Sequence, residues 1–183
     1  MSVRIVILNG VGSAGKTSIV KALQEMLGKP FLHVSMDVFC EMLPPAYFDH
    51  PDGFQFVPHV TADGPSVEIR TGPAGARLMD GMRHAIAALA ASGCDLIVDD
   101  VMLGEEHLAY RHLLAGYRVH WVGIHAGLAV LEERERRRGD RMIGLARWQF
   151  DRVHAGKIYD LEIDTGLASA QDCARQIKER FSL

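Results

Sequence analysis

The stretch of sequence that decides the fold reads Gly10-Val11-Gly12-Ser13-Ala14-Gly15-Lys16-Thr17. It matches in full the phosphate-binding pattern G-x-x-x-x-G-K-[ST], in which glycines let backbone N–H groups turn inward around phosphate oxygens. An apolar run over residues 3–9 precedes the motif and predicts a buried strand, and apolar residues at helix spacing over residues 19–27 follow it. The alternative is a glycine-rich turn that caps an ordinary helix. The strand-loop-helix context favours binding of a nucleoside triphosphate.

Each part of this motif, the P-loop, has an expected role. Lys16 is expected to reach the β- and γ-phosphates of ATP, and Thr17 to offer its hydroxyl to Mg²⁺. The helix that begins near Lys16 adds the positive end of its dipole. ATP and Mg²⁺ are therefore the expected cofactors. The residues of this segment predicted to bind the nucleotide are Gly10, Val11, Gly12, Ser13, Ala14, Gly15, Lys16, Thr17 and Ser18.

Size and composition limit the classes of protein that the chain can belong to. Its 183 residues are enough to bury a core, which predicts a single domain over residues 1–183. A net charge of −3 gives no general attraction to nucleic acid. The chain opens directly into a predicted strand and has no apolar stretch of membrane-spanning length, so we expect a cytoplasmic protein without membrane or nucleic-acid partners. The sequence is compatible with a monomer or a homo-oligomer.

Strands and helices alternate along the chain, which is typical of parallel sheets built from βαβ units. The class is therefore α/β, with a five-stranded parallel sheet covered by helices on both faces. Residues 44–74 form an excursion with no clear period, and residues 134–147 a predicted lid. The expected strands cover residues 3–9, 31–35, 95–100, 117–124 and 158–163. The expected helices cover residues 38–43, 75–91, 105–115, 128–137, 143–154 and 169–181.

Acidic residues follow the predicted strands at the edge of the sheet where ligands collect. Asp37 follows the second strand, where a carboxylate can accept the proton of a hydroxyl that attacks a γ-phosphate. Its other interpretation is a cap for the helix over residues 38–43. Asp99 and Asp100 close the third strand, and their side chains point in opposite directions. We expect Asp99 to serve the metal, and Asp100 to be a structural acceptor or a substrate contact.

A basic run lies between two predicted helices from Arg134 to Arg141. Arginine grips phosphate oxygens in pairs and keeps its charge, so a lid with arginines can neutralise a moving phosphoryl group. The alternative is a solvated helix face of Glu–Arg pairs. Because a Gly-Asp break divides the run, we predict catalytic roles for Arg138 and Arg141 and nucleotide contact for Arg134. Arg136 and Arg137 are expected to be surface charges.

Aromatic and apolar residues gather in and near the 44–74 excursion, as the wall of a partly apolar acceptor pocket requires. A small satellite core under a long loop would look the same. The predicted substrate-pocket residues are Ser35, Phe39, Met42, Phe48, Phe54 and Asp100.

Several classes of P-loop protein do not fit this sequence. A regulatory GTPase needs an N-K-x-D element, which is excluded because Asn9 is the only asparagine. A polynucleotide kinase needs an extended basic groove, which the charge balance does not support. The length, Asp37 and the lid favour a kinase for a small molecule. A nucleotide kinase and a regulatory NTPase that acts on a protein partner are the alternatives.

Together, these segments resemble the chloramphenicol 3-O-phosphotransferase family over nearly the whole chain, in order and at similar spacing. The resemblance implies a nucleotide-kinase-like P-loop NTPase fold and transfer of the γ-phosphoryl group of ATP to a hydroxyl of a small molecule, chloramphenicol or a related antibiotic or metabolite. Asp37 matches the catalytic aspartate of the family, and Arg138 and Arg141 fall in its lid motif. The segments that carry the resemblance are 7–10, 13–17, Asp37, 97–101, 121–123, 134–135 and 138–141. The sequence departs most between Pro44 and Gly75, where the acceptor pocket is expected.

Overall fold

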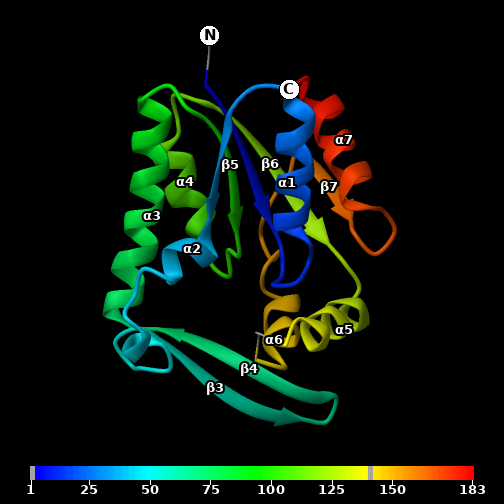
Figure 1. The fold of residues 1–183 in the computed structure, drawn as a ribbon. Coiled ribbons are helices and arrows are strands. Elements are labelled where there is room, and N and C mark those ends of the chain that lie inside the picture. The colour runs from blue at the N-terminus through cyan, green and yellow to red at the C-terminus, as the bar shows by residue number, and fades with distance from the viewer. Residues whose placement is uncertain (1–2, 140–141) are drawn as a thin grey trace.

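The computed structural model describes residues 3–139 and 142–183 and has a five-stranded parallel sheet at its centre (Figure 1). The strand order is β2-β5-β1-β6-β7, and every neighbouring pair is parallel. The α/β class and the five-stranded parallel sheet predicted from the sequence are thus confirmed. The strands are β1 (Arg4–Asn9), β2 (Phe31–Ser35), β5 (Asp95–Asp100), β6 (Arg118–His125) and β7 (Leu161–Asp164).

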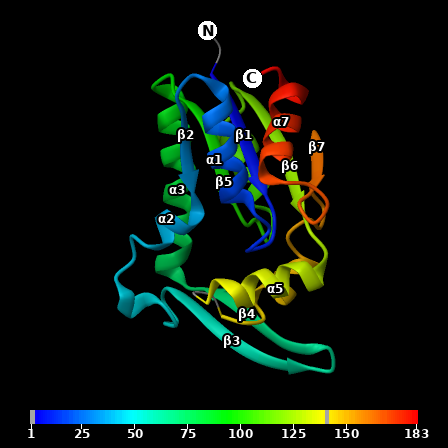
Figure 2. The same ribbon diagram turned by 45° about the vertical axis from the view of Figure 1, so that its right-hand side comes forward.

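Helices cover both faces of the sheet, as the continuous apolar strands require. Helices α1 (Lys16–Leu27) and α7 (Ala170–Phe181) pack on one face, and α3 (Pro73–Ala91) and α4 (Glu106–Leu113) on the other (Figures 1 and 2). Over residues 3–139 and 142–183, no helix combines the length and the apolar character that crossing a bilayer demands. The remaining helices are α2 (Met36–Cys40), α5 (Leu128–Arg138), α6 (Leu145–Phe150) and the short 3₁₀ helix η1 (Pro45–Tyr47).

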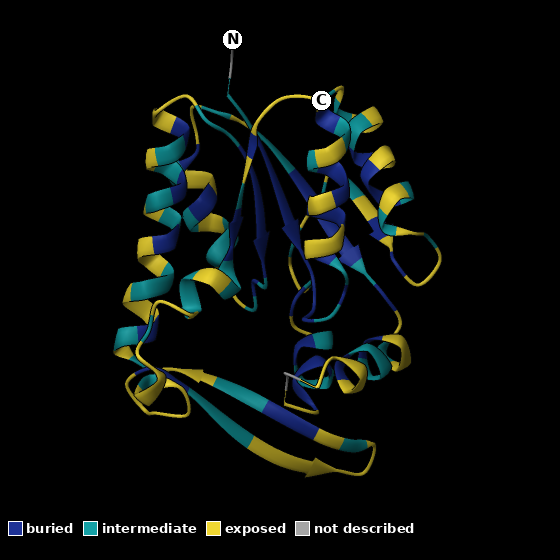
Figure 3. Cartoon of the chain, viewed as in Figure 1, coloured by how far each residue is buried: buried dark blue, intermediate teal, exposed yellow. Residues whose placement is uncertain are grey.

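The central strand β1 supplies side chains to two separate layers of core. Ile5 and Ile7 point toward α3 and α4, whereas Val6 and Leu8 point toward α1 and α7, and all four are fully buried. Figure 3 shows the resulting pattern, with buried strands between helices whose outer faces are exposed. Burial on both sides explains why residues 5–8 form a continuous apolar run rather than an alternating one.

The 44–74 excursion contains a two-stranded antiparallel hairpin that we did not predict from the sequence. Strands β3 (Phe54–Thr61) and β4 (Gly64–Thr71) pair along their whole length and lie beyond the carboxyl ends of the central strands (Figure 1). Pro58 lies in the sequence of β3 and Pro65 in that of β4. A proline within a segment argues against predicting that segment as a strand. Here proline is tolerated because a two-stranded ribbon consists of edges.

The other elements differ from the predicted ones mainly at their ends. Helix α2 begins at Met36, two residues before the expected start, and α6 is shorter than the predicted helix over residues 143–154. Strand β7 begins at Leu161 rather than at residue 158. Propensity is weakest at element ends, where local hydrogen bonds decide the boundary.

Gly10 follows the central strand and is required by packing. A Cβ atom at this position would lie 2.4 Å from the carbonyl oxygen of Ile124 in β6. The first glycine of the P-loop therefore lets two parallel strands approach each other at the edge of the cavity described below.

We predict that Gly10→Ala lowers the free energy of unfolding by about 1–3 kcal/mol, because the new methyl group overpacks the β1–β6 contact. Chemical denaturation measures this loss. Gly81→Ala on α3 is the control, since no atom lies within 4 Å of its Cβ position and alanine favours a helix by about 1 kcal/mol. An equal or smaller loss for Gly10→Ala than for the control contradicts the packing role.

Candidate active site

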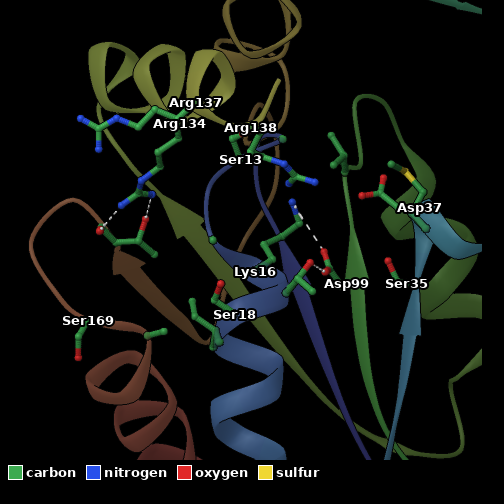
Figure 4. Close-up of a pocket in the computed structure, with 18 of the residues that line it drawn as sticks. Ser13, Lys16, Ser18, Ser35, Asp37, Asp99, Arg134, Arg137, Arg138 and Ser169 are labelled. Atoms are coloured by element: carbon green, nitrogen blue, oxygen red, sulfur yellow. Dashed lines mark hydrogen bonds and ion pairs between the residues drawn. The ribbon is translucent and has the colours of Figure 1, made fainter. Parts of the chain in front are cut away.

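A cavity of about 530 Å³ lies at the carboxyl ends of the sheet strands, and we call it the P-loop cavity (Figure 4). It lies where the connection after β1 runs to one side of the sheet, to β2, and the connection after the neighbouring strand β6 runs to the other side, to β7. Open parallel sheets bind ligands at this position. The P-loop residues that line it are Gly12, Ser13, Gly15, Lys16, Thr17 and Ser18. Gly10, Val11 and Ala14, also predicted to bind nucleotide, are not among the lining residues, and the side chains of Val11 and Ala14 are buried in the core.

The backbone of the loop has the conformation of an anion-binding cup. Gly15 has a φ of 91° and precedes Lys16, the first residue of α1, and no side chain caps this helix end. Ser13 also adopts a positive φ, of 66°, and its buried Oγ has no hydrogen-bond partner among the described residues. An uncapped helix N-terminus and an unpaired buried hydroxyl both fit the oxygens of a phosphate group.

Thr17 and Asp99 provide oxygen atoms of the kind that Mg²⁺ prefers. Thr17 Oγ1 donates a hydrogen bond to Asp99 Oδ2 over 2.8 Å, and Lys16 Nζ lies 3.8 Å from Asp99 Oδ1. Burial raises the pKa of Asp99, but the charge of Lys16 and the hydrogen bond from Thr17 contribute to a net pKa below the usual value. The residues that the sequence predicted for the metal therefore fit a magnesium ion that also binds phosphate oxygens.

Asp100 is buried and faces a different environment from its neighbour. Its Oδ1 accepts a hydrogen bond from the Val101 N–H over 2.7 Å, and its Oδ2 accepts one from the Tyr110 hydroxyl over 2.8 Å. Burial raises the pKa of Asp100 above its usual value, even though both hydrogen bonds act in the other direction. The alternation of strand side chains thus separates the two aspartates, as predicted.

A second cavity, of about 640 Å³, lies next to the β3–β4 hairpin, and we call it the hairpin cavity. Phe48, Phe54 and Asp100 line it, as the sequence predicted for a substrate pocket, together with Phe56 and Met79. Aromatic and aliphatic walls with a few polar groups are typical of small-molecule sites.

Three predicted pocket residues lie elsewhere, which corrects the sequence interpretation. Ser35 lines the P-loop cavity, because it ends β2 beside β5. Phe39 packs against the core on the α3 side of the sheet. Met42 lies in the turn after α2, with 67% of its surface exposed, and does not line the hairpin cavity. The three residues lie on different elements, at the end of β2, in α2 and in the turn after it, so nearness to Asp37 along the chain does not bring them to the hairpin cavity.

Asp37 lies where the two cavities meet. It lines both of them, together with Met36, Val101 and Arg138. The N-cap position of α2 is Ser35, and Asp37 belongs to the first turn of the helix, so the alternative interpretation of Asp37 as the helix cap is wrong. The carboxylate is placed between a phosphate-binding cup and a partly apolar chamber.

The arginines of the lid divide into two groups. Figure 4 shows Arg134 and Arg138 extending from α5 into the P-loop cavity, and Arg134 donates hydrogen bonds to Oγ1 and the carbonyl oxygen of Thr165. Arg136 and Arg137 form ion pairs with Glu133 on the exposed face of α5, although Arg137 also lines the rim of the cavity. Arg141, the other predicted catalytic arginine, lies outside the described residues.

A buried carboxylate fixes the lid. Glu135 is 2% exposed and accepts hydrogen bonds from the N–H groups of Gly144 and Ala146 over 2.8 and 2.9 Å. The Val67 N–H in β4 donates to the Gly144 carbonyl oxygen over 3.0 Å. Gly144 therefore joins the lid to the hairpin by a backbone hydrogen bond, and the lid borders both cavities.

Two further residues support the P-loop cavity and were missed from the sequence. Gln149 Oε1 accepts a hydrogen bond from the Gly12 N–H over 2.8 Å, and Thr165 Oγ1 donates one to the Ala14 carbonyl oxygen over 2.8 Å. Thr165 follows β7, so the rule that ligand-binding residues follow parallel strands could have found it. No sequence signal marks Gln149, which lies just inside the end of a short helix.

Comparison with known proteins agrees with this arrangement. The family model described as chloramphenicol phosphotransferase-like protein matches residues 3–182. The chain belongs to this family. A relative from Mycobacterium tuberculosis strain H37Rv, named a putative O-phosphotransferase, is 33% identical over 97% of this chain and 82% of its own length. The resemblance predicted from the sequence is confirmed, and the protein is a phosphotransferase-type P-loop protein.

Solved structures of kinases share the fold. The Mycobacterium tuberculosis APS kinase in complex with AMPPNP and APS aligns with a TM-score of 0.69 and 17% identity, over 100% of this chain and 99% of that one. The Deinococcus radiodurans tunicamycin resistance protein aligns with a TM-score of 0.68 and 21% identity, over 99% and 96% of the two chains. At these identities the likeness concerns the fold, and it confirms the P-loop kinase-like architecture of this member of the chloramphenicol phosphotransferase-like family.

We predict that Gly144→Ala separates the lid from the hairpin. Gly144 has a φ of 106°, and a Cβ atom there would lie 2.9 Å from the Pro65 carbonyl oxygen, so alanine is both strained and crowded. The amide of Val67 should then exchange with solvent at least about tenfold faster, as measured by hydrogen exchange.

Gly139→Ala is the matched control for this prediction. Gly139 also has a positive φ, of 69°, but apart from its chain neighbours no atom of the described residues lies within 4 Å of its Cβ position. Both variants place a side chain at a positive φ, and only Gly144→Ala also crowds the hairpin. Equal exchange of the Val67 amide in both variants would show that the Gly144 contact does not hold the hairpin.

Proposed function

We propose that this protein is an ATP- and Mg²⁺-dependent phosphotransferase that moves the γ-phosphoryl group to a hydroxyl of a small molecule, chloramphenicol or a related hydroxylated antibiotic or metabolite. The observation that carries the proposal is the position of Asp37, which lines both the P-loop cavity and the hairpin cavity. Transfer between two bound molecules needs a group at the point where they meet. Membership of the chloramphenicol phosphotransferase-like family supports the same reaction.

The P-loop cavity takes the triphosphate in this proposal. The N-terminus of α1, the backbone of the loop and Lys16 bind the phosphate oxygens, as their arrangement around the cavity supports. Thr17 and Asp99 would hold Mg²⁺, which when bound neutralises charge on the β- and γ-phosphates. Arg134 and Arg138 add positive charge from the lid side.

The hairpin cavity takes the acceptor, with its hydroxyl directed to Asp37. The Asp37 carboxylate orients this hydroxyl and accepts its proton, while the hydroxyl oxygen forms a bond to the γ-phosphorus and the bond between that phosphorus and ADP breaks. Because the transition state is loose, the position of the hydroxyl and the neutralisation of charge contribute more than the basicity of Asp37. Arg138 lines both cavities and can stabilise the phosphoryl group as it moves.

Incubation with ATP, Mg²⁺ and a panel of hydroxylated compounds tests the proposal. The panel contains chloramphenicol, other hydroxylated antibiotics, sugars, hydroxy acids and nucleoside monophosphates. Mass spectrometry should detect one added phosphoryl group on a small molecule together with ADP. Phosphorylation of a nucleoside monophosphate alone would indicate a nucleotide kinase, and slow ATP hydrolysis with no product on any compound would indicate a regulatory NTPase.

We predict that Asp37→Asn reduces phosphoryl transfer by about 10²-fold or more, because the amide cannot accept the proton of the hydroxyl. The affinity for AMPPNP with Mg²⁺, measured by calorimetry, should change little, since the carboxylate acts on the acceptor side. Asp63→Asn in the exposed turn of the hairpin is the control and should keep full activity. Turnover of Asp37→Asn near that of the unmodified protein would remove Asp37 from the reaction.

We predict that Lys16→Ala weakens AMPPNP binding and lowers transfer by about 10²-fold or more, because a buried cation beside the phosphates is lost. Lys21→Ala, an exposed position on the same helix, is the matched control. Calorimetry and the rate of ADP release measure the two effects. Unchanged AMPPNP affinity and turnover in Lys16→Ala would contradict the phosphate-binding role of the loop.

A further inference from the structure

Arg83 gives the hairpin cavity a positive charge of its own. The described residues contribute two cations to its lining, Arg83 and Arg138. Arg138 also lines the P-loop cavity, where the proposed function uses it for the phosphoryl group. Among the described residues, Arg83 is therefore the one cationic side chain that lines the hairpin cavity and not the P-loop cavity.

Arg83 reaches the cavity from one face of α3. Ala76, Met79 and Arg83 follow each other at spacings of three and four residues, which places them on the same side of the helix, and all three line the cavity. The Arg83 side chain is only 13% exposed. A long charged side chain is thus held against an apolar chamber instead of extending into solvent.

The guanidinium of Arg83 lacks hydrogen-bond partners within the part of the chain that the structure describes. Its Nε is buried and has no partner there. Its one ion pair is with Asp80, over 3.7 Å from Nη2 to Oδ1, and the Asp80 side chain is 59% exposed, so solvent weakens this pair. The buried Nε–H lacks an acceptor among the described residues, and an unsatisfied buried donor is costly.

Two carboxyl groups of the same cavity already accept hydrogen bonds from other residues. Both oxygens of Asp100 accept hydrogen bonds, from Val101 and Tyr110, and burial disfavours the ionised form of this side chain. Glu106 Oε2 accepts a hydrogen bond from the Gly104 N–H over 2.7 Å. Neither residue forms a hydrogen bond with Arg83 in the described structure. A molecule bound in the hairpin cavity can therefore supply acceptor oxygens to Arg83.

We infer that the acceptor of this phosphotransferase carries a carboxylate, in addition to the hydroxyl that is phosphorylated, and that Arg83 binds this carboxylate. The inference rests on the proposed function. A guanidinium fork matches the two oxygens of a carboxylate. The aromatic and aliphatic walls, including Phe54, Phe56 and Met79, fit an apolar body between the two polar ends.

A single carboxylate fits the charges of the cavity better than a phosphate monoester does. Asp37, Glu41, Asp100 and Glu106 line the same cavity, and they oppose the binding of a doubly charged group. Arg83 alone compensates for one negative charge. The substrate class is therefore a hydroxylated carboxylic acid with an apolar or aromatic body, rather than a nucleoside monophosphate.

Matched pairs of acceptors that differ only in charge test this inference. We would compare para-hydroxymethylbenzoate with para-hydroxymethylbenzamide, together with further hydroxy acids and their amides. The value of kcat/KM is obtained from ADP release with ATP and Mg²⁺, and phosphorylation of each compound is verified by mass spectrometry. The proteins are the unmodified chain, Arg83→Gln, Arg83→Lys and Arg77→Gln, an exposed position on the same helix.

The expected result is a preference for the acids of roughly tenfold or more in the unmodified protein and in Arg77→Gln. In Arg83→Gln the ratio of acid to amide should fall to about one because kcat/KM for the acid is lost, while AMPPNP affinity in the P-loop cavity stays the same. Arg83→Lys should keep part of the preference, because the charge remains and the fork is lost. A merely structural role of Arg83 would lower the values for acid and amide together.

Several results would overturn the inference. These are equal use of acids and amides by the unmodified protein, a preference that persists in Arg83→Gln, and phosphorylation of chloramphenicol or a nucleoside monophosphate with no hydroxy acid used. In each of these cases the phosphotransferase activity still stands. If no compound is phosphorylated and AMPPNP does not bind, the proposed function itself is wrong, and the inference fails with it.

Discussion

The hydrogen bond from Thr17 to Asp99 joins the start of α1 to the end of β5, and the candidate site is arranged around it. It is possible because β1 and β5 are parallel neighbours whose carboxyl ends lie at the same edge of the sheet. Lys16, one residue earlier, is held against the same carboxylate. The order of the strands therefore brings a loop near residue 15 and a strand end near residue 100 to one cavity. Strand β2, on the other side of β5, places Asp37 at its border.

This part of the molecule could be predicted from the sequence because each signal is local. The P-loop pattern, the apolar runs and the acidic residues after strands are all read within a few residues of one another, and the rules of parallel sheets then place them together. Asp37 and Asp99 were found in this way. The separation of Asp99 from Asp100 followed from the alternation of side chains along a strand.

The remaining features depend on contacts between distant segments. Pro58 and Pro65 concealed the hairpin, because the rule against proline in strands assumes that the strand has neighbours on both sides. The buried Glu135 reads as one of many charges in a basic run, and only the fold shows that it accepts two backbone hydrogen bonds. Ser35, Phe39 and Met42 were misplaced, since distance along the chain does not fix which cavity the end of a strand, a short helix or a turn faces.

The contact between Val67 and Gly144 limits how this protein can diverge or be engineered. A hairpin transplanted from another enzyme to change acceptor choice would also have to offer an N–H group to residue 144. A hairpin that failed to do so would withdraw support from the segment that follows Arg138. New specificity in the hairpin therefore has to arise in step with compensating changes in the neighbouring arginine-bearing segment.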